Sequence, residues 1–278
     1  MTENEALLQA VCAEPDNDEP RLVYADWLEE NGDLARAEFI RMQLKLAKTP
    51  YRSYPWDRLT IQRRIMDKWL EQLPALQGIL WYPLFRRGFP AAVEVENFAA
   101  FRSHAATLFR TAPIEYVRFR RLRGTKRLAA MPDLARLTEL DLGNLRLGPG
   151  DAEILANSPY LAGLRELHLN NNRLGDQGVI ALTRSPHLKK LVKIDLSNNN
   201  IGAEGVKVLA RAPILESVRH LDLVGNDIDD EGAEALVHSP YLQDIDGLTF
   251  AAWNFHGISE ESYRRLKERY GFHVVFGD

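Results

Sequence analysis

A short phrase, Leu140-Asp141-Leu142, returns four more times in the second half of the chain. Each copy starts 27 residues after the one before, at Leu167-His168-Leu169, Ile194-Asp195-Leu196, Leu221-Asp222-Leu223 and Leu248-Thr249-Phe250. Prolines keep the same interval, at Pro132, Pro159, Pro186, Pro213 and Pro240. A period of this length is typical of stacked supersecondary units, each of which buries its apolar residues against its neighbours.

An asparagine and a further apolar residue complete the phrase. The asparagines are Asn172, Asn199 and Asn226, each three residues past the second apolar position. The whole pattern, L-x-L-x-x-N-x-L, resembles the signature of leucine-rich repeats. Because 27 residues leave room for a strand and a full helix, the units are similar to the ribonuclease-inhibitor-like class. The resemblance implies a right-handed α/β solenoid, with a parallel sheet on its concave face and helices on its convex face.

The alternation within each phrase predicts a short parallel strand. Its two outer residues should point into the core and its middle residue away from it. Asn172 and its two equivalents should pair with backbone groups of the turn, where an unpaired buried group costs about 1–3 kcal/mol. Leu145 and Trp253 take the asparagine position in the first and last units, so the predicted asparagine ladder ends there.

The rest of each unit favours a helix that leads back to the next strand. Val206, Leu209 and Ala210 share one helical face, and the helix should end at Ala212-Pro213. Glycines recur with the same period. We assign them to the turn that enters each helix rather than to a phosphate-binding loop: Gly175, Gly178, Gly202 and Gly205.

The composition is that of an ordinary globular protein, with 45% hydrophobic and 27% charged residues. The net charge of -4 gives no general attraction to nucleic acid. Cys12 is the only cysteine, which excludes an internal disulfide and fits a reducing compartment. No apolar run approaches the ~20 residues of a membrane helix, and the first residues lack the basic region of a signal peptide. We expect a cytoplasmic protein without membrane contact or cofactor.

Three short helices are predicted at the N-terminus, over 3–13, from the N-cap Asp18 to Asn31-Gly32, and from Asp33 to Ala47. The string Pro20-Arg-Leu-Val-Tyr-Ala-Asp-Trp-Leu-Glu-Glu-Asn-Gly-Asp33, followed by Arg36-Ala-Glu-Phe-Ile-Arg41, resembles a short companion domain. That family precedes repeat arrays, largely in planctomycete-type bacteria. The resemblance covers residues 3–47 and implies a helical module and a bacterial source, with no catalytic role.

The side chains of this module divide into core and surface. We assign Cys12, Tyr24 and Trp27 to the core, and Leu34 to the apolar stripe of the third helix. The charged residues have two interpretations, a recognition surface or a set of ion pairs and caps that hold the helices together. We favour the ion pairs. The residues concerned are Asp26, Glu29, Arg36, Glu38 and Arg41.

We divide the chain into a helical module at 1–48, a connector with one helix at 49–90, and a repeat domain at 91–278. The repeat domain comprises degenerate cap units at 91–136, regular units at 137–256 and a C-terminal cap at 257–278. The degenerate strands are Val93-Glu-Val95 and Val117-Arg-Phe119. A last helix and strand should cover the open edge of the sheet, which would otherwise be exposed.

The outward positions of the strands are the best candidates for function, because they project from a rigid scaffold. Such faces of repeat proteins commonly bind macromolecules. We predict non-catalytic binding of a protein or peptide there; the alternative is that these positions are polar only for solubility. The candidate residues are Glu139, Asp141, Glu166, His168, Lys193, Asp195, His220 and Asp222.

Imidazole and carboxylate groups among these residues raise the possibility of a metal-dependent enzyme. The candidate ligands are His168, Asp195, His220 and Asp222. His168 and His220 are two repeats apart, which is ~10 Å by strand spacing. The sequence also has no H-E-x-x-H, P-loop, G-x-S-x-G or paired-cysteine motif. We therefore predict no metal and no enzyme.

A basic stretch at 118–127 offers a different binding mode. Such a run can attract phosphates, but the whole chain is acidic and lacks an evident aromatic platform for bases. Binding of nucleic acid or of an acidic partner stays as the alternative, with the acidic partner favoured. The stretch contains Arg118, Arg120, Arg121, Arg123, Lys126 and Arg127.

Overall fold

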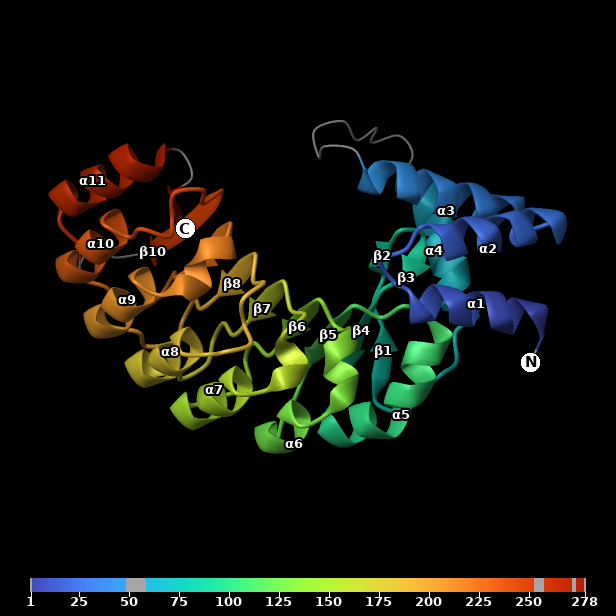
Figure 1. Ribbon diagram of the computed structural model, residues 1–278, viewed down its shortest axis with the longest axis horizontal. Coiled ribbons are helices and arrows are strands. Elements are labelled where there is room, and N and C mark those ends of the chain that lie inside the picture. The colour runs from blue at the N-terminus through green and yellow to red at the C-terminus, as the bar shows by residue number, and fades with distance from the viewer. Residues whose placement is uncertain (1, 49–58, 253–257, 272–273, 278) are drawn as a thin grey trace. The chain divides into compact units, whose positions relative to one another are not determined.

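The computed structural model describes residues 2–48, 59–252, 258–271 and 274–277 (Figure 1). Residues 49–58 of the connector predicted at 49–90, and Trp253, lie outside the described residues. The chain forms two compact units, Met1–Arg118 and Phe119–Asp278. No helix within the described ranges is long and apolar enough to cross a membrane.

Four helices open the first unit: α1 (Glu3–Ala13), α2 (Glu19–Glu30), α3 (Leu34–Ala47) and α4 (Leu59–Leu70). Thr2 and Glu5 form a capping box at the start of α1, and the Asp33 side chain accepts a hydrogen bond from the Arg36 amide at the start of α3. Such caps satisfy amides that the first turn leaves without a helical partner. Asp18 precedes α2 as predicted, but its carboxylate lies 2.9 Å from Lys48 Nζ instead of capping the helix.

Aromatic rings fill the core of this unit. The Trp69 ring centroid lies 5.6 Å from that of Phe85 and 5.2 Å from that of Phe89, and Tyr24 and Phe39 are buried beside them. Cys12 is buried, as predicted. This core joins helices to residues far along the chain.

One apolar prediction for this unit is wrong. Leu34 is 56% exposed rather than part of the inward stripe of α3. Leu22 and Val23 on α2 are also exposed, because Tyr24, Ala25 and Leu28 occupy the buried side of that helix.

Strands and one more helix complete the first unit: β1 (Ile79–Trp81), β2 (Phe85–Arg86), β3 (Phe89–Pro90), β4 (Ala92–Val95), α5 (Phe98–Thr111) and β5 (Tyr116–Phe119). β1 pairs antiparallel with β4, and β2 with β3. The β2–β3 hairpin turns at Arg87 and Gly88, whose φ angles are 50° and 84°. Positive φ at both central residues is the requirement of a tight hairpin turn.

The second unit repeats a strand and a helix. Its strands are β6 (Glu139–Asp141), β7 (Glu166–His168), β8 (Lys193–Asp195), β9 (His220–Asp222), β10 (Gly247–Ala252) and β11 (Val274–Gly277). Its α-helices are α6 (Thr125–Ala129), α7 (Pro149–Ala156), α8 (Gly175–Thr183), α9 (Ala203–Ala210), α10 (Asp230–Val237) and α11 (Glu260–Tyr270). Three of the periodic prolines open 3₁₀ turns that precede a strand: Pro132–Arg136, Pro159–Leu161 and Pro213–Ser217.

The strands of this unit form one parallel sheet in chain order from β6 to β11. The helices lie along the other side of the array (Figure 1). This arrangement confirms the predicted α/β solenoid, with the helical module before it.

The first apolar residue of every phrase lies in one buried row. Register partners run Leu140, Leu167, Ile194, Leu221 and Leu248, and each is at most 3% exposed. Burying an aliphatic side chain contributes roughly 1.5–3 kcal/mol. Since a single repeat has no partner for this row, stability comes from the stack.

Asparagine side chains tie successive repeats together behind the strands. Asn199 Nδ2 donates to the carbonyls of Leu169 at 2.9 Å and Leu196 at 3.1 Å, and its Oδ1 accepts from the Leu174 amide at 3.3 Å. Asn172 accepts from the amides of Leu145 and the next apolar position, Leu147. Asn226 makes the equivalent bonds one repeat later. Each asparagine therefore bonds both its own repeat and the preceding one.

A second set of ties was not predicted. Serines before three of the periodic prolines donate their hydroxyls to a carbonyl one repeat earlier: Ser158 to Ala129, Ser185 to Ala156 and Ser239 to Ala210. The spacing of the Ser-Pro pairs was the signal in the sequence that could have identified them.

The assignment of the periodic glycines needs correction. Gly178 and Gly205 lie within α8 and α9, not in the turn before each helix. A Cβ on Gly205 would lie 2.5 Å from Asp176 Oδ1 and 2.9 Å from Ile201 Cγ2. Glycine is required at these positions because neighbouring repeats approach each other closely there.

Candidate functional site

Parallel pairing stacks the outward residues of the strands into two columns. One column runs Glu139, Glu166, Lys193 and His220; the other runs Asp141, His168, Asp195 and Asp222. We call these eight residues the strand face. Gly247 and Thr249 continue the two columns on β10. The structure thus places all eight candidate residues on four neighbouring strands, each step being about 4.8 Å.

The strand face is more buried than an ordinary polar surface. Glu139 is only 9% exposed, His220 is exposed, and the other six residues are half-buried. Burial raises the pKa of Asp222. The hydrogen bond from the Val224 amide lowers this pKa, and the nearby Asp195 carboxylate raises it. Charges held with partial desolvation interact more strongly with an incoming group than fully hydrated charges do.

Aspartates of the strand face also hold the turn that follows each strand. The carboxylate of Asp195 accepts hydrogen bonds from the amide and hydroxyl of Ser197, at 3.0 and 2.6 Å. Asp141 and Asp222 accept from the amides two residues on, at 2.8 and 3.0 Å. Side chains of this type commonly bond the backbone two residues later. One oxygen of each aspartate is therefore structural, a role that sequence reasoning missed.

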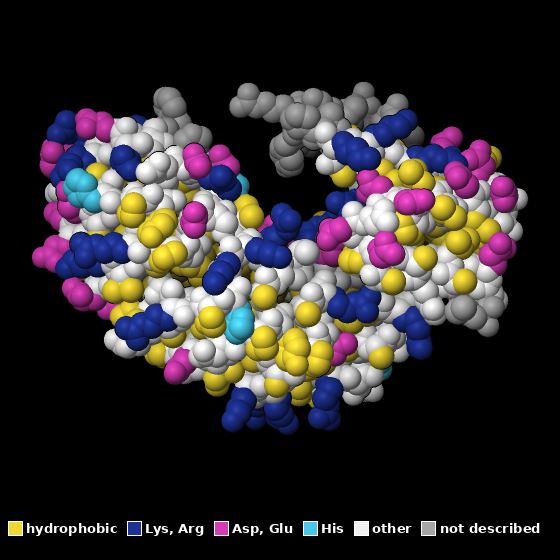
Figure 2. Space-filling model, viewed as in Figure 1, with side chains coloured by type: hydrophobic (Ala, Val, Ile, Leu, Met, Phe, Trp, Pro, Cys, Tyr) yellow, Lys and Arg dark blue, Asp and Glu magenta, His cyan; other side chains and the backbone are white. Residues whose placement is uncertain are grey.

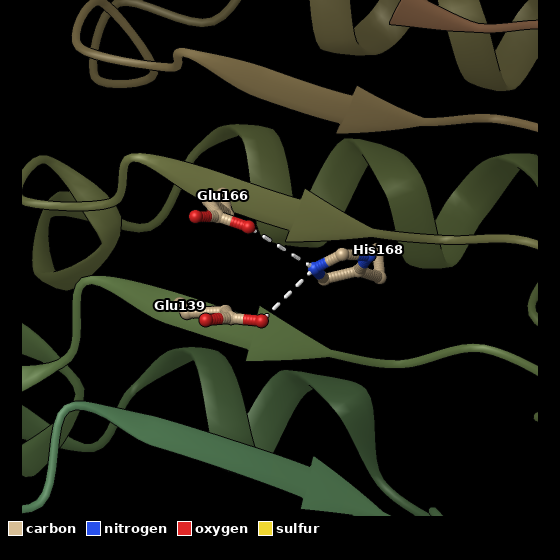
Figure 3. Close-up of side chains that lie close together, drawn as sticks. All are labelled: Glu139, Glu166 and His168. Carbon is tan, nitrogen blue, oxygen red and sulfur yellow. Dashed lines mark hydrogen bonds and ion pairs between the residues drawn. The ribbon is translucent and has the colours of Figure 1, made fainter. Parts of the chain in front are cut away.

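Three ionisable side chains of the strand face converge at one point (Figure 3). His168 Nε2 lies 3.2 Å from Glu139 Oε1 and 3.7 Å from Glu166 Oε2. Burial opposes the charged imidazole, but the hydrogen bonds to Glu139 and Glu166 outweigh burial and raise the pKa of His168 to about 9, while Lys193 opposes them. His168 is therefore an imidazolium held between two carboxylates at neutral pH.

The structure gathers different potential metal ligands from those suggested by the sequence. The proposed set of His168, Asp195, His220 and Asp222 shares only His168 with the group whose ligand atoms lie within 4.8 Å of one another. That group is Glu139, Glu166 and His168. Its donors suit a divalent transition ion in kind, but the His168 imidazolium already pairs with both carboxylates as an ion cluster. The sequence signal for this group was the diagonal relation of Glu139 and His168, which lie in different columns on neighbouring strands.

The basic stretch spans the end of a strand, a loop and a helix. Arg118 is on β5, 3.9 Å from Glu94. Arg120, Arg121 and Arg123 are exposed in the following loop, and Lys126 and Arg127 are exposed on α6. Phe119 is buried between them in sequence. Five cations of the stretch are thus open to solvent along part of their length.

Part of the repeat array matches a known family model. A family model described as Leucine Rich repeat matches residues 164–182, 187–210 and 215–237. These segments cover the units that contain β7, β8 and β9 with their helices. The fold is an α/β leucine-rich-repeat solenoid preceded by helices.

Solved structures include a similar chain, the crystal structure of an internalin (inlF) from Listeria monocytogenes. The match has 14% identity and a TM-score of 0.36, and it covers 66% of this chain and 58% of the internalin chain. None of the curated proteins compared with the chain gives a significant match. Leucine-rich-repeat proteins in general are interaction scaffolds.

Proposed function

We propose that this chain is a non-catalytic scaffold that binds a protein or peptide partner on the strand face. The observation that supports the proposal most is the register of β6 to β9, which sets eight outward residues, seven of them at least partly buried, on rigid strands. Positioned charges on rigid elements give specificity to an interface because their geometry is fixed before binding.

The charges of the strand face indicate the chemistry of that partner. Five carboxylates face Lys193 and the His168 imidazolium, so the face is acidic. Within the Glu139–Glu166–His168 cluster the imidazolium balances one of the two carboxylate charges. The excess lies at Asp141, Asp195 and Asp222, which favours a partner that offers lysine or arginine along the second column.

The test uses substitutions that keep the turns intact. Asp195→Asn and Asp222→Asn together remove two charges but retain the oxygen that accepts from the Ser197 and Val224 amides. We expect at least tenfold less partner captured from the native cell, with the melting temperature nearly unchanged. Glu231→Gln, an exposed residue of α10, is the matched control. Undiminished capture by the double variant would refute the strand face as the binding site.

A second candidate function rests on the exposed cations of 120–127. They would bind an acidic protein segment or, less favourably, nucleic acid. Titration with generic RNA and DNA at increasing salt separates this candidate from the first, because phosphate binding weakens steeply with salt. Binding that is insensitive to salt, or unaffected by Arg120→Gln with Arg121→Gln, would exclude it.

The setting of the protein is part of the same proposal. The single cysteine, Cys12, is buried and reduced, which supports a reducing, cytoplasmic environment. The string 20–33 supports a bacterial companion module N-terminal to the repeats, with the domain limits proposed from the sequence.

A further inference from the structure

A second surface, on α1 and α2, differs in kind from the strand face. Leu22 and Val23 are 43% and 47% exposed on α2. Trp27, one turn beyond Val23, is half-buried and its indole nitrogen donates to Glu3 on α1 at 3.0 Å. Val23 and Trp27 are four residues apart, so they lie on the same side of the helix. At 100° per residue, Leu22 lies at one edge of the exposed side of α2, and Val23 with Trp27 lies at the other edge. We call this exposed side the α2 strip.

Acidic side chains run along the middle of this strip, between its apolar edges. From Glu3 to Glu30 the sequence has nine acidic residues and one basic residue, Arg21, and Arg21 is completely buried. Glu19, Asp26 and Glu30 lie on the exposed side of α2 together with Leu22 and Val23. In Figure 2, hydrophobic side chains gather over α1 and α2 with Asp and Glu around them, and the Lys and Arg of this unit lie beyond that area.

The acidic side chains are only partly compensated by their own helices. Arg41 on α3 pairs with Asp26 at 2.6 Å and with Glu29. Glu19 and Glu30 are exposed at the two ends of the strip. A row of one sign of charge that is flanked by exposed apolar side chains offers a partner both charge complementarity and apolar contact.

We propose that the α2 strip docks a basic amphipathic segment of a partner protein. Apolar side chains of that segment would cover Leu22, Val23 and Trp27. Its lysine or arginine side chains would reach Glu19, Asp26 and Glu30. A helix that carries apolar and basic residues at intervals of three and four satisfies both requirements, because it presents the two kinds of side chain along adjacent edges. This surface is separate from the strand face and does not depend on the function proposed for it.

The experiment measures binding of a synthetic amphipathic peptide of leucine and lysine to the full chain. Leu22→Ser with Val23→Ser should lower the affinity about tenfold or more, since losing two apolar contacts is worth at least 1.4 kcal/mol. Glu19→Gln with Glu30→Gln should lower it several-fold and flatten its salt dependence. Both pairs are exposed, so circular dichroism should report an unchanged fold.

Two controls distinguish docking from general attraction. Val208→Ser removes an apolar residue of α9 that is 37% exposed, and it should change the affinity less than twofold. If Asp195→Asn with Asp222→Asn weakens peptide binding as much as the α2 variants do, the peptide binds the strand face and the proposal is overturned. A scrambled peptide of the same composition that binds equally well would overturn the proposal. So would self-association of the free chain that Leu22→Ser with Val23→Ser abolishes, because the occupant would then be a second copy.

Discussion

In the second unit Leu167 meets Leu140 on one side and Ile194 on the other, each 27 residues away, and the relation recurs in every regular repeat. In the first unit Trp69 meets Phe85 and Phe89, and Phe39 meets Phe85, across intervals with no common period. A periodic core can be recognised from sequence because each contact is repeated. An aperiodic core depends on unique pairings, so its stability should respond differently to substitution.

The largest expected effect concerns the ties between repeats. Asn199→Ala removes buried hydrogen bonds in a completely buried site: the Leu174 amide loses its partner, and the carbonyls of Leu169 and Leu196 each lose one of two asparagine donors. We expect the free energy of unfolding to fall by about 3–5 kcal/mol in chemical denaturation. Asn226→Ala should cost less, because Asn226 is half-buried and water can replace part of its bonding. Equal losses at the two positions would show that burial does not set the cost.

The next effect tests the ion cluster on the sheet. The pKa of His168 is raised from 6.5 to about 9, so its stabilisation is complete below pH 6.5 and is lost as the pH rises through 9. The full difference corresponds to roughly 3 kcal/mol. Urea unfolding at both ends of this range should show the loss in the wild type and not in His168→Gln. If His168→Gln shows the same loss of stability with rising pH, groups other than His168 are responsible for it.

A smaller effect distinguishes glycines that touch a neighbouring repeat from those that do not. Gly205→Ala forces a methyl group against Asp176 and Ile201, and we expect a loss of about 1–3 kcal/mol. Gly150→Ala in α7 meets open space, so it should be neutral or stabilise by about 0.4–1 kcal/mol. Thermal unfolding of both variants measures the contrast, which vanishes if the helices can move apart at no cost.

The smallest effect belongs to the first unit. Arg21 is completely buried, and burial lowers its pKa against the pull of Glu115, with the Arg87 cation acting in the same direction as burial. Its Nη1 donates to the Asn17 carbonyl at 3.1 Å, but Nε and Nη2 have no partner within the described part of the chain.

Arg21→Met keeps the volume and removes the buried charge. We expect the free energy of unfolding to change by less than about 1 kcal/mol, toward greater stability. A loss of several kcal/mol would show that the guanidinium, which lies 5.5 Å from the Phe89 ring centre, is a required part of this core.

Much of the repeat fold could be predicted because its determinants recur. The buried row from Leu140 to Leu248 follows from the alternation and the period. The hairpin at Phe85–Pro90 could not be predicted, because its φ angles at Arg87 and Gly88 are set by a contact with α3: a Cβ on Gly88 would lie 2.6 Å from Ile40 Cα. Leu34 was placed inward by helical spacing alone, which cannot tell which side of a short helix is covered.

The candidate site was predictable in position but not in chemistry. The period placed Asp195 beside Asp222, as the register has it. It gave no indication that both carboxylates bond the following turn. Likewise, predicting the pairing of His168 with Glu139 requires the directions of side chains on two neighbouring strands. A pattern along one strand does not contain this information.

The double role of the aspartates limits how this surface can diversify. A change at Asp195 or Asp222 that removes the acceptor oxygen would disturb the adjacent turn as well as the proposed binding face, so we expect such changes to be disfavoured. Lys193 and His220, in the other column, face outward at the same height on β8 and β9. We therefore expect substitutions that change binding specificity to accumulate first at these two positions, while the aspartates stay unchanged.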